Sequence, residues 1–473
     1  MRCETCERYD VAIVGGGSAG FAAAIKAADL GARVALIEGG TLGGTCVNVG
    51  CVPSKTLIRA AEIAHHRVHH PFDGIPRSDG TADWAAVHAQ KDVLVTKLRE
   101  AKYWNVLRAY DSVTLIEQRA ELTPGHAVRL TDGTVLEAEK LIVTTGASSW
   151  TPPIPGLVEA DPLDSATAMA LERLPASLIV IGGSAVGLEL AQMFSRLGVA
   201  VTVLEALPRV VPAEDPDIGA ALAGYLRDEG LIVHTGVTII RVEPGDGART
   251  VVFREESGEE RRVQAEQVLV AAGRRANTGG LGLEAAGVTL GAKREIEVNE
   301  FLQTSNPAIY TAGDVIGDPM FVYVAAYAGA LAAENALSGN VRRYDLTALP
   351  RVTFTDPAVA SVGLTELTAR GSGSEPIISA LGLEHVPRSL AARDTRGFVK
   401  LVADSTTRRI IGAHILAAEA GEMITEPALA MKLGLTIEDL TSAFHPYLTL
   451  SEGVKLAALA FSKDVAKLSC CAA

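Results

Sequence analysis

The sequence lacks the features that would place it in several simple protein classes. Only 6 of its 473 residues are cysteine, which excludes a small disulfide-stapled scaffold. Basic residues (43) are outnumbered by acidic ones (56), and the net charge is −13. Proteins whose main partner is nucleic acid need a basic face, so this balance argues against a nucleic-acid partner.

Long apolar runs and a secretory leader are also missing. The longest uncharged run, residues 141–158, contains three prolines and two glycines and would not span a bilayer. The first residues are charged and lead directly into a strand pattern, unlike a signal peptide. We therefore expect a cytoplasmic protein with no membrane span. The length suggests about three domains, and 48% hydrophobic residues are normal for a well-packed globular protein.

The sequence does contain a repeated motif. "DVAIVGGGSAGFAAAIKAADLGARVALIEGG" and "SLIVIGGSAVGLELAQMFSRLGVAVTVLEAL" each begin with an apolar strand pattern, Val11–Val14 and Leu178–Ile181. A glycine-rich turn, a helical pattern and a second strand follow in both. The acid that ends the second strand is 23 residues after the first glycine in each copy (positions 15 to 38 and 182 to 205). This is the βαβ fingerprint of dinucleotide-binding proteins.

The residues of the fingerprint have separate physical roles. The first glycine makes the tight turn, the second lets a pyrophosphate approach the backbone, and the third lets helix and strand pack closely. Phosphate oxygens then meet free N–H groups at the start of the helix, and the acid accepts hydrogen bonds from ribose hydroxyls. The second copy has Ser184 at its middle position and is the weaker match. Two such sites predict FAD and a nicotinamide dinucleotide.

Three further strand ends belong to this prediction. "YTAGDV" places Asp314 where it can reach flavin ribityl or pyrophosphate groups, and "VTTGA" and "VAAGRR" each close a nucleotide domain. The residues expected to bind the two cofactors are Gly15, Gly17, Ser18, Ala19, Gly20, Glu38, Thr45, Lys55, Gly146, Asp314, Gly182, Ser184, Val186, Gly187, Glu205 and Gly273.

A cysteine pair follows the first fingerprint in "GGTLGGTCVNVGCVPSK". Cys46 and Cys51 would be about 7.5 Å apart along an ideal helix, too far for a relaxed disulfide. Gly50 and Pro53 would let the backbone distort, and a bond formed there should be strained and easily reduced. Lys55 follows on the same predicted helix, where it could place a positive charge near the flavin.

These motifs together resemble the flavin disulfide oxidoreductases, such as glutathione reductase and lipoamide dehydrogenase. The resemblance implies an α/β fold with tandem Rossmann-like FAD- and NAD(P)-binding domains and a C-terminal α+β dimerisation domain. It implies a homodimer in which Cys46 is the interchange thiol, Cys51 is the thiolate against the flavin, and Lys55 pairs with Glu189. The expected segments are 1–150 and 276–347 for FAD, 151–275 for NAD(P), and 348–473 for the interface domain.

The end of the chain departs from the members that reduce disulfides. Those members carry a catalytic histidine in a pattern like "HxHPTLSE", whereas this chain reads "FHPYLTLSEG". An ungapped alignment puts Tyr447 at the position of the base. An alternative alignment with a two-residue insertion would restore His445 as the base. We prefer the ungapped alignment.

This segment and the terminal "KLSCCAA" resemble the mercuric reductases, and "LREAKYWNVL" supplies Tyr103, which resembles their second metal-site tyrosine. The resemblance implies reduction of Hg(II) to Hg(0) with NAD(P)H. Cys470 and Cys471 have Cα atoms only about 3.8 Å apart, which suits metal capture better than a disulfide. They would hand the ion to Cys46 and Cys51 of the other subunit, assisted by Tyr103 and Tyr447. The metal-binding residues are therefore expected to be Cys46, Cys51, Cys470, Cys471, Tyr103 and Tyr447.

Several features leave alternatives open. Glu205 should repel a 2′-phosphate and favours NADH, although mercuric reductases generally use NADPH, for which Arg209 is the nearest cationic partner. Glu205 and His445 would also suit a dihydrolipoamide dehydrogenase. A thiol metal-binding protein with a vestigial flavin fold is a third possibility.

The remaining cysteines and histidines give weaker signals. Only residues 1–9 precede the first predicted strand, so we expect no separate N-terminal mercury-binding domain. Cys3 and Cys6 lie in this stretch, where metal capture and an unimportant exposed pair are equally compatible with the sequence. "HHRVHH" (65–70) is best explained as a solvated cluster, and His445 as a structural residue.

Overall fold

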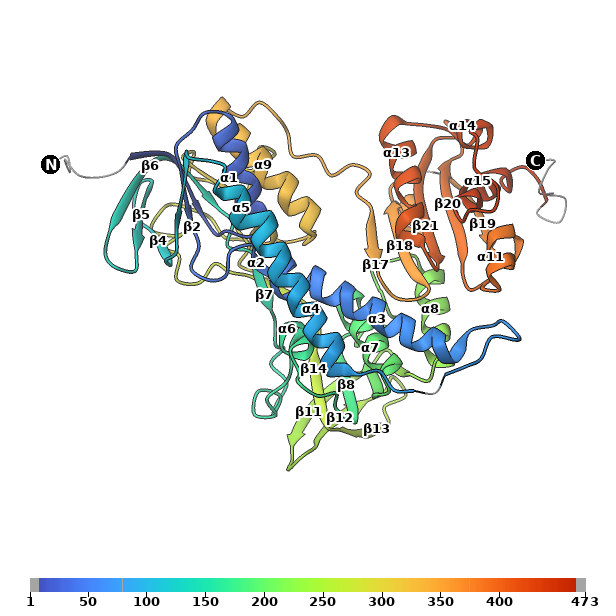
Figure 1. The fold of residues 1–473 in the computed structure, drawn as a ribbon. Coiled ribbons are helices and arrows are strands. Elements are labelled where there is room, and N and C mark those ends of the chain that lie inside the picture. The colour runs from blue at the N-terminus through green and yellow to red at the C-terminus, as the bar shows by residue number, and fades with distance from the viewer. Residues whose placement is uncertain (1–7, 79, 374, 465–473) are drawn as a thin grey trace. The chain divides into compact units, whose positions relative to one another are not determined.

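The structure is a computed structural model that describes residues 8–78, 80–373 and 375–464. The chain forms two compact units. The first consists of the chain up to Thr56, Ala85–Trp150 and Gly273–Asp345, and the second of Leu57–Trp84, Thr151–Ala272 and the chain from Leu346 on. The expected fold class is confirmed, because the chain contains two dinucleotide-type sheets, one mixed and one parallel, and a C-terminal antiparallel sheet with helices (Figure 1).

The first unit is built on a seven-stranded sheet with strand order β3-β2-β1-β6-β5-β4, in which β16 also pairs with β6. β1 lies between β2 and β6 in parallel pairing, and its inner residues are buried on both faces, which explains its continuous apolar run. The strands are β1 (Arg8–Val14), β2 (Val34–Ile37), β3 (Val113–Ile116), β4 (Ala120–Leu122), β5 (Ala127–Leu130), β6 (Val135–Val143) and β16 (Ile309–Thr311).

One face of this sheet is covered by two alanine-rich helices, α1 (Ser18–Asp29) and α9 (Val322–Ser338), which lie side by side (Figure 1). Small residues permit this close approach: a Cβ on Gly329 would lie 2.0 Å from the carbonyl oxygen of Ala19. The first unit also contains α2 (Gly44–Val49), the start of α3 (Cys51–His69), most of α4 (Trp84–Arg99), η1 (Glu100–Trp104), α5 (Asn105–Leu107), β7 (Ala147–Ser149), β15 (Arg274–Ala276) and η2 (Asp314–Ile316).

The second unit contains the second nucleotide-type sheet, which is parallel with strand order β10-β9-β8-β14. A three-stranded antiparallel sheet, β11-β12-β13, was not expected from the sequence. The elements are α6 (Ser165–Met169), β8 (Ser177–Ile181), α7 (Ala185–Arg196), β9 (Ala200–Leu204), α8 (Pro216–Asp228), β10 (Ile232–His234), β11 (Thr238–Pro244), β12 (Arg249–Arg254), β13 (Glu260–Ala265) and β14 (Gln267–Val270).

The C-terminal part of the second unit is a five-stranded antiparallel sheet of order β17-β18-β21-β20-β19, with helices packed on its apolar face. Its strands are β17 (Arg351–Thr353), β18 (Ala358–Gly363), β19 (Pro376–Gly382), β20 (Phe398–Asp404) and β21 (Ile410–Ala417). Its helices are α10 (Glu366–Gly371), η3 (Leu383–His385), α11 (Pro387–Ala392), α12 (Ala420–Met423), α13 (Thr425–Leu433), α14 (Ile437–Ser442) and α15 (Glu452–Leu459).

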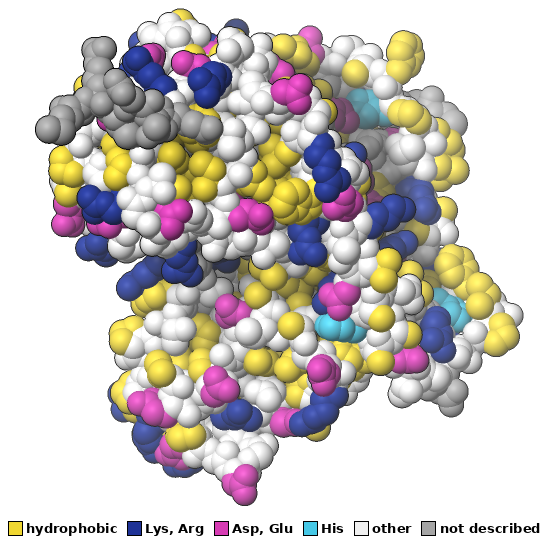
Figure 2. Space-filling view, turned by 60° about the vertical axis from the view of Figure 1, so that its left-hand side comes forward, with side chains coloured by type: hydrophobic (Ala, Val, Ile, Leu, Met, Phe, Trp, Pro, Cys, Tyr) yellow, Lys and Arg dark blue, Asp and Glu magenta, His cyan; other side chains and the backbone are white. Residues whose placement is uncertain are grey.

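Charged and hydrophobic side chains are mixed on one face of the molecule. On the face shown in Figure 2, cationic and anionic side chains are interspersed with apolar ones, so this face carries no extended field of one sign. Within residues 8–78, 80–373 and 375–464, no helix combines the length and apolarity needed to cross a membrane.

Candidate functional site

The first fingerprint folds into a tight turn that has space at its middle glycine. Gly15 has φ +112°, and a Cβ there would lie 2.4 Å from the carbonyl oxygen of Thr144. A Cβ on Gly20 would lie 1.7 Å from the carbonyl oxygen of Gly15, so only glycine allows this helix–strand approach. At Gly17 the nearest atom would be 3.7 Å away. Gly17 also begins α1 without a side-chain cap, so the turn fits a dinucleotide pyrophosphate.

Glu38, the acid that follows β2, connects the glycine-rich turn before α1 with the chain just after β2. Glu38 accepts hydrogen bonds from the backbone N–H groups of Gly16 and Gly40, both at 2.6 Å and one at each carboxylate oxygen. Each carboxylate oxygen has a second lone pair, so Glu38 can still accept a ribose hydroxyl. The acid therefore shapes the turn as well as marking the expected ribose site.

The second fingerprint repeats this geometry in the second unit. Gly182 has φ +114°, and a Cβ on Gly187 would lie 2.0 Å from the carbonyl oxygen of Gly182. Ser184 caps α7 in an extended conformation (φ −95°) without a side-chain cap bond, so serine is accommodated where the first copy has glycine. Glu205 accepts hydrogen bonds from the N–H groups of Gly183 (2.5 Å) and Leu207 (2.7 Å). The weaker sequence match thus gives an equivalent site.

The segment around Asp314 lies next to the first fingerprint. A Cβ on Gly313 (φ +82°) would lie 2.9 Å from the Cβ of Ala19, near the start of α1. Burial raises the pKa of Asp314 and outweighs the opposing charge of Arg274. The role of Asp314 at a flavin stays a prediction. Arg274 was not predicted, although it follows Gly273 directly in "VAAGRR".

The cysteine pair lies across a break between two helices. Cys46 is on α2 and Cys51 begins α3, while Gly50 between them has φ −123° and ψ −106°. A Cβ on Gly50 would lie 2.9 Å from the carbonyl oxygen of Thr45, so a larger residue would not fit without movement. Both cysteines are partly buried and are not joined by a disulfide. The backbone therefore departs from an ideal helix between the thiols.

The surroundings of Cys46 make its thiol a weaker acid than usual. A hydrogen bond with Cys51, burial, and the charge of Cys51 all raise the pKa of Cys46, while the charge of Lys55 opposes them. The roles of Cys46 as the interchange thiol and Cys51 as the thiolate against the flavin stay predictions of the family resemblance.

Tyr103 belongs to the same unit as the cysteine pair and is close enough to be influenced by the charges of both thiols. It lies in η1, a π-helical turn between α4 and α5, and such turns are frequent at functional sites. Its ring packs edge-on against Phe21, with 4.7 Å between centroids, and a Cβ on Gly43 would lie 3.2 Å from it. Burial and the charges of Cys46 and Cys51 raise the pKa of Tyr103, so its hydroxyl keeps its proton at neutral pH.

Other predicted site residues lie apart from this group. Glu189 on α7 and Tyr447, between α14 and α15, belong to the second unit, so their pairing with Lys55 or the thiols stays a prediction. Tyr447 is 54% exposed, and Leu448 beside it has φ +62°. His445 Nε2 lies 2.6 Å from Glu426 Oε1, which agrees with a structural role. Cys3, Cys6, Cys470 and Cys471 lie outside the described residues.

The histidine cluster does not form a metal site in the described part of the chain. His65 and His69 stack with 4.4 Å between ring centroids, and burial lowers the pKa of His65 to about 4. No group of three or more histidine, cysteine, aspartate or glutamate side chains suited to a metal ion occurs among the described residues.

Comparisons with known families agree with this geometry. Residues 9–329 match the family described as pyridine nucleotide-disulphide oxidoreductase. Residues 349–458 match the dimerisation domain of the same family.

Individual relatives match over almost the whole chain. A mercuric reductase from Staphylococcus aureus is 47% identical over 98% of this chain and 84% of its own length. One from Streptomyces lividans is 46% identical over 98% of both chains. Among solved structures, the HOCl-induced flavoprotein disulfide reductase RclA from Escherichia coli is 30% identical, with a TM-score of 0.85, over 96% of this chain and 99% of its own.

Proposed function

Because the chain belongs to the pyridine nucleotide-disulphide oxidoreductase family, and specifically to its mercuric reductases, we propose that it is an FAD-dependent enzyme that reduces Hg(II) to Hg(0). The overall reaction is NADH (or NADPH) + Hg²⁺ → NAD⁺ (or NADP⁺) + H⁺ + Hg⁰. The observation that carries the proposal is the cysteine pair beside the first fingerprint, in a chain 44–47% identical to seven mercuric reductases.

The residues of both fingerprints have roles in cofactor binding under this proposal. The turn Gly15–Gly20 and the N-terminus of α1 would hold the FAD pyrophosphate, with Glu38 at the ribose and Asp314 at the ribityl or pyrophosphate groups. The turn after β8 would hold the nicotinamide coenzyme in the same way. Bound FAD would accept two electrons from the coenzyme and supply them for reduction of the metal ion.

The chemistry of the thiol pair suits a soft metal ion. Thiolates are the preferred ligands of soft cations, and deprotonation of Cys46 and Cys51 would provide two of them. Lys55, whose charge acts to lower the pKa of Cys46, favours loss of the proton from Cys46. The neutral hydroxyl of Tyr103 can donate a hydrogen bond or offer a lone pair to an ion that exchanges ligands here.

The terminal pair of cysteines would deliver the Hg(II) ion to the inner thiol pair. Cys470 and Cys471 would take Hg(II) from small-molecule thiols and pass it to Cys46 and Cys51 one ligand at a time. The match to a dimerisation domain supports a homodimer with sites shared between subunits. Tyr447, together with the fully exposed Phe444 in the same segment, would then face the other subunit's thiol pair.

A substrate comparison tests the function. The FAD-loaded protein is supplied with NADH and either Hg(II) in excess thiol or lipoamide, and NADH oxidation is followed. We expect Hg(II)-dependent oxidation with formation of volatile mercury, and little turnover of lipoamide. Rapid lipoamide reduction without any response to Hg(II) would instead support the dihydrolipoamide dehydrogenase alternative, which Glu205 and His445 would suit.

The coenzyme preference follows from the surroundings of Glu205. Its carboxylate is fixed by two main-chain N–H groups, so a 2′-phosphate at this ribose would meet an immobile anion. Arg209 donates to the carbonyl oxygen of Pro212 (3.0 Å), which directs its guanidinium toward its own loop. We therefore expect NADH to be preferred by about 10-fold or more in kcat/KM, equivalent to about 1.4 kcal/mol. A preference for NADPH in steady-state kinetics would contradict this assignment.

A further inference from the structure

Helix α7 carries three polar side chains on one buried face. Glu189, Gln192 and Arg196 are spaced i, i+3 and i+7, which places them in a row. Glu189 is 6% exposed, Gln192 is 4% exposed, and the side chain of Arg196 is 4% exposed. Buried polar groups are costly unless they are hydrogen-bonded, so the partners of this row indicate its purpose.

All three side chains reach the same short segment, Phe354–Asp356, between β17 and β18. Glu189 Oε1 accepts a hydrogen bond from the N–H of Phe354 (2.9 Å). Gln192 accepts from the N–H of Asp356 and donates to its carbonyl oxygen, both at 2.8 Å. Arg196 Nη2 donates to Asp356 Oδ2 (2.9 Å). The row therefore binds the main chain of the segment at two points and its carboxylate at a third.

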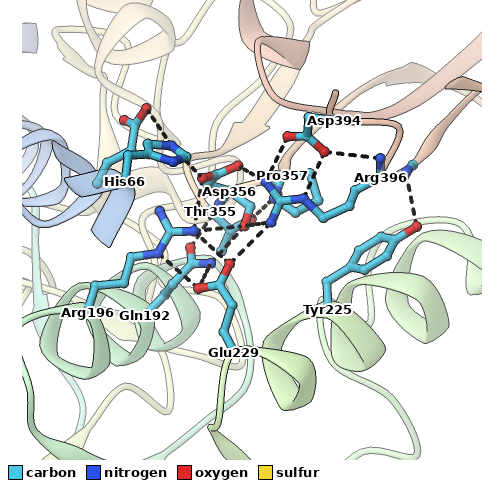
Figure 3. A network of polar contacts seen from close by, with 12 residues as sticks. His66, Gln192, Arg196, Tyr225, Glu229, Thr355, Asp356, Pro357, Asp394 and Arg396 are labelled. Carbon is cyan, nitrogen blue, oxygen red and sulfur yellow. Dashed lines mark hydrogen bonds and ion pairs between the residues drawn. The ribbon is translucent and has the colours of Figure 1, made fainter. Parts of the chain in front are cut away.

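A network of charges holds the far end of this segment. Arg196 and Arg396 each bind one oxygen of the Asp356 carboxylate, at 2.9 Å, and both also contact Glu229 (Figure 3). Asp394 binds Arg396 from the other side (2.8 Å). Burial alone would lower the pKa of Arg196, but its bonds to Glu229 and Asp356 outweigh burial and raise it. The segment cannot move away from α7 without leaving buried charges unpaired.

We propose that the segment Phe354–Asp356 positions Glu189 for electron transfer from the nicotinamide coenzyme, and that Gln192 is a positioning residue for that step. Glu189 follows Gly187 by two residues on the helix whose N-terminus forms the second fingerprint. The N–H of Phe354 fixes one oxygen of its carboxylate, and Gln192 fixes the strand of main chain that carries this N–H. A polar group that is held in place contributes most to the reaction step in which it orients the reacting groups, here electron transfer from the coenzyme.

The inference rests on the proposed function to the extent that a nicotinamide coenzyme binds at the second fingerprint. It concerns only reduction of the enzyme, which can be followed without mercury. A protein that reduced other acceptors but not Hg(II) would therefore refute the proposed substrate and leave this inference testable.

The test uses Gln192→Met, which keeps the length of the side chain and removes both hydrogen bonds to Asp356 together with the 3.1 Å bond that Gln192 donates to Glu229. In anaerobic stopped-flow experiments on the FAD-loaded enzyme, we expect the rate constant for flavin reduction by NADH to fall by about 10- to 100-fold, the range expected for a small misplacement. Reoxidation of the pre-reduced enzyme by Hg(II) should stay within about twofold of the unchanged protein, because Gln192 does not act in that half-reaction.

A matched control separates positioning from general loss of stability. Ser379 in β19 is buried and donates a 2.6 Å hydrogen bond to the carbonyl oxygen of Ala457, away from α7 but in the same unit. Ser379→Ala should lower the melting temperature without changing the rate of flavin reduction. Equal slowing in Ser379→Ala and Gln192→Met would overturn the proposal.

Two further measurements ask whether Gln192 acts through Glu189. Flavin reduction in the double variant with Glu189→Gln should be no slower than in Glu189→Gln alone, whereas additive losses would overturn the proposal. Hydrogen exchange at the Phe354 amide, read by mass spectrometry, is independent of activity. It should be faster in Gln192→Met than in the unchanged protein and in Ser379→Ala, and unchanged exchange would count against the inference.

Discussion

At the scale of single residues, the acidity of Cys46 depends on its neighbours. Its pKa is raised because it shares a hydrogen bond with Cys51, is buried, and would ionise beside the charge of Cys51. Two of these three causes depend on the Cys51 sulfur, and a third residue, Lys55, acts in the opposite direction. The raised pKa of Cys46 can therefore be changed one neighbour at a time.

The pH dependence of alkylation tests these causes of the raised pKa of Cys46. In the dithiol form, Cys51→Ala should lower the midpoint for reaction of Cys46 with iodoacetamide by about one pH unit or more, because two causes of the raised pKa are removed. Lys55→Met should shift the midpoint to higher pH, since its charge favours the thiolate. Mass spectrometry of the Cys46 peptide across a pH series measures both. Identical midpoints in all three proteins would show that the neighbours do not set the acidity.

At the scale of elements, the break at Gly50 fixes the arrangement of the two thiols. Gly50→Ala would place a Cβ 2.9 Å from the Thr45 carbonyl oxygen, so the helix ends must separate. We expect the free energy of unfolding to fall by about 1–3 kcal/mol, as for other overpacked sites. Gly224→Ala is the matched control: it lies inside α8 with no atom within 4 Å of the new Cβ, and should stabilise by about 0.5–1 kcal/mol. Chemical denaturation of both variants measures the difference, and loss of stability in neither would contradict the steric argument.

Elements with a local sequence signal could be predicted, and elements defined by tertiary contacts could not. The strand–turn–helix copies at β1–α1 and β8–α7 were predicted because glycine spacing and apolar runs encode them within about thirty residues. The π-helical turn that carries Tyr103 has no such signal, since "EAKYW" is compatible with a continuous helix. Of the row Glu189, Gln192 and Arg196 on α7, only Glu189 was named from the sequence. Its partners at 354–356 lie more than 150 residues away in the chain, and no pattern in the sequence connects them.

At the scale of the whole molecule, the delivery of Hg(II) is proposed to pass from one chain to the thiol pair of another. The thiol pair lies in the first unit, whereas Tyr447 and the interface sheet belong to the second. The fold of one chain therefore does not decide whether Cys470 and Cys471 deliver the ion to the thiol pair of their own chain or to that of the other subunit. The match to a dimerisation domain supports a homodimer, in which the proposed delivery between subunits can be tested.

Mixed dimers test delivery between subunits. One chain carries Cys470→Ala and Cys471→Ala with an intact inner pair, and the other carries Cys46→Ala with an intact tail. Each homodimer should be nearly inactive toward strongly chelated Hg(II). Random pairing after co-expression makes half of the dimers mixed, each with one complete site, so the mixture should recover about a quarter of full activity. Delivery within a subunit predicts no recovery, because neither chain then has both dithiols. Flavin reduction by NADH, which requires neither tail cysteine, is the control that both chains are folded and loaded with FAD.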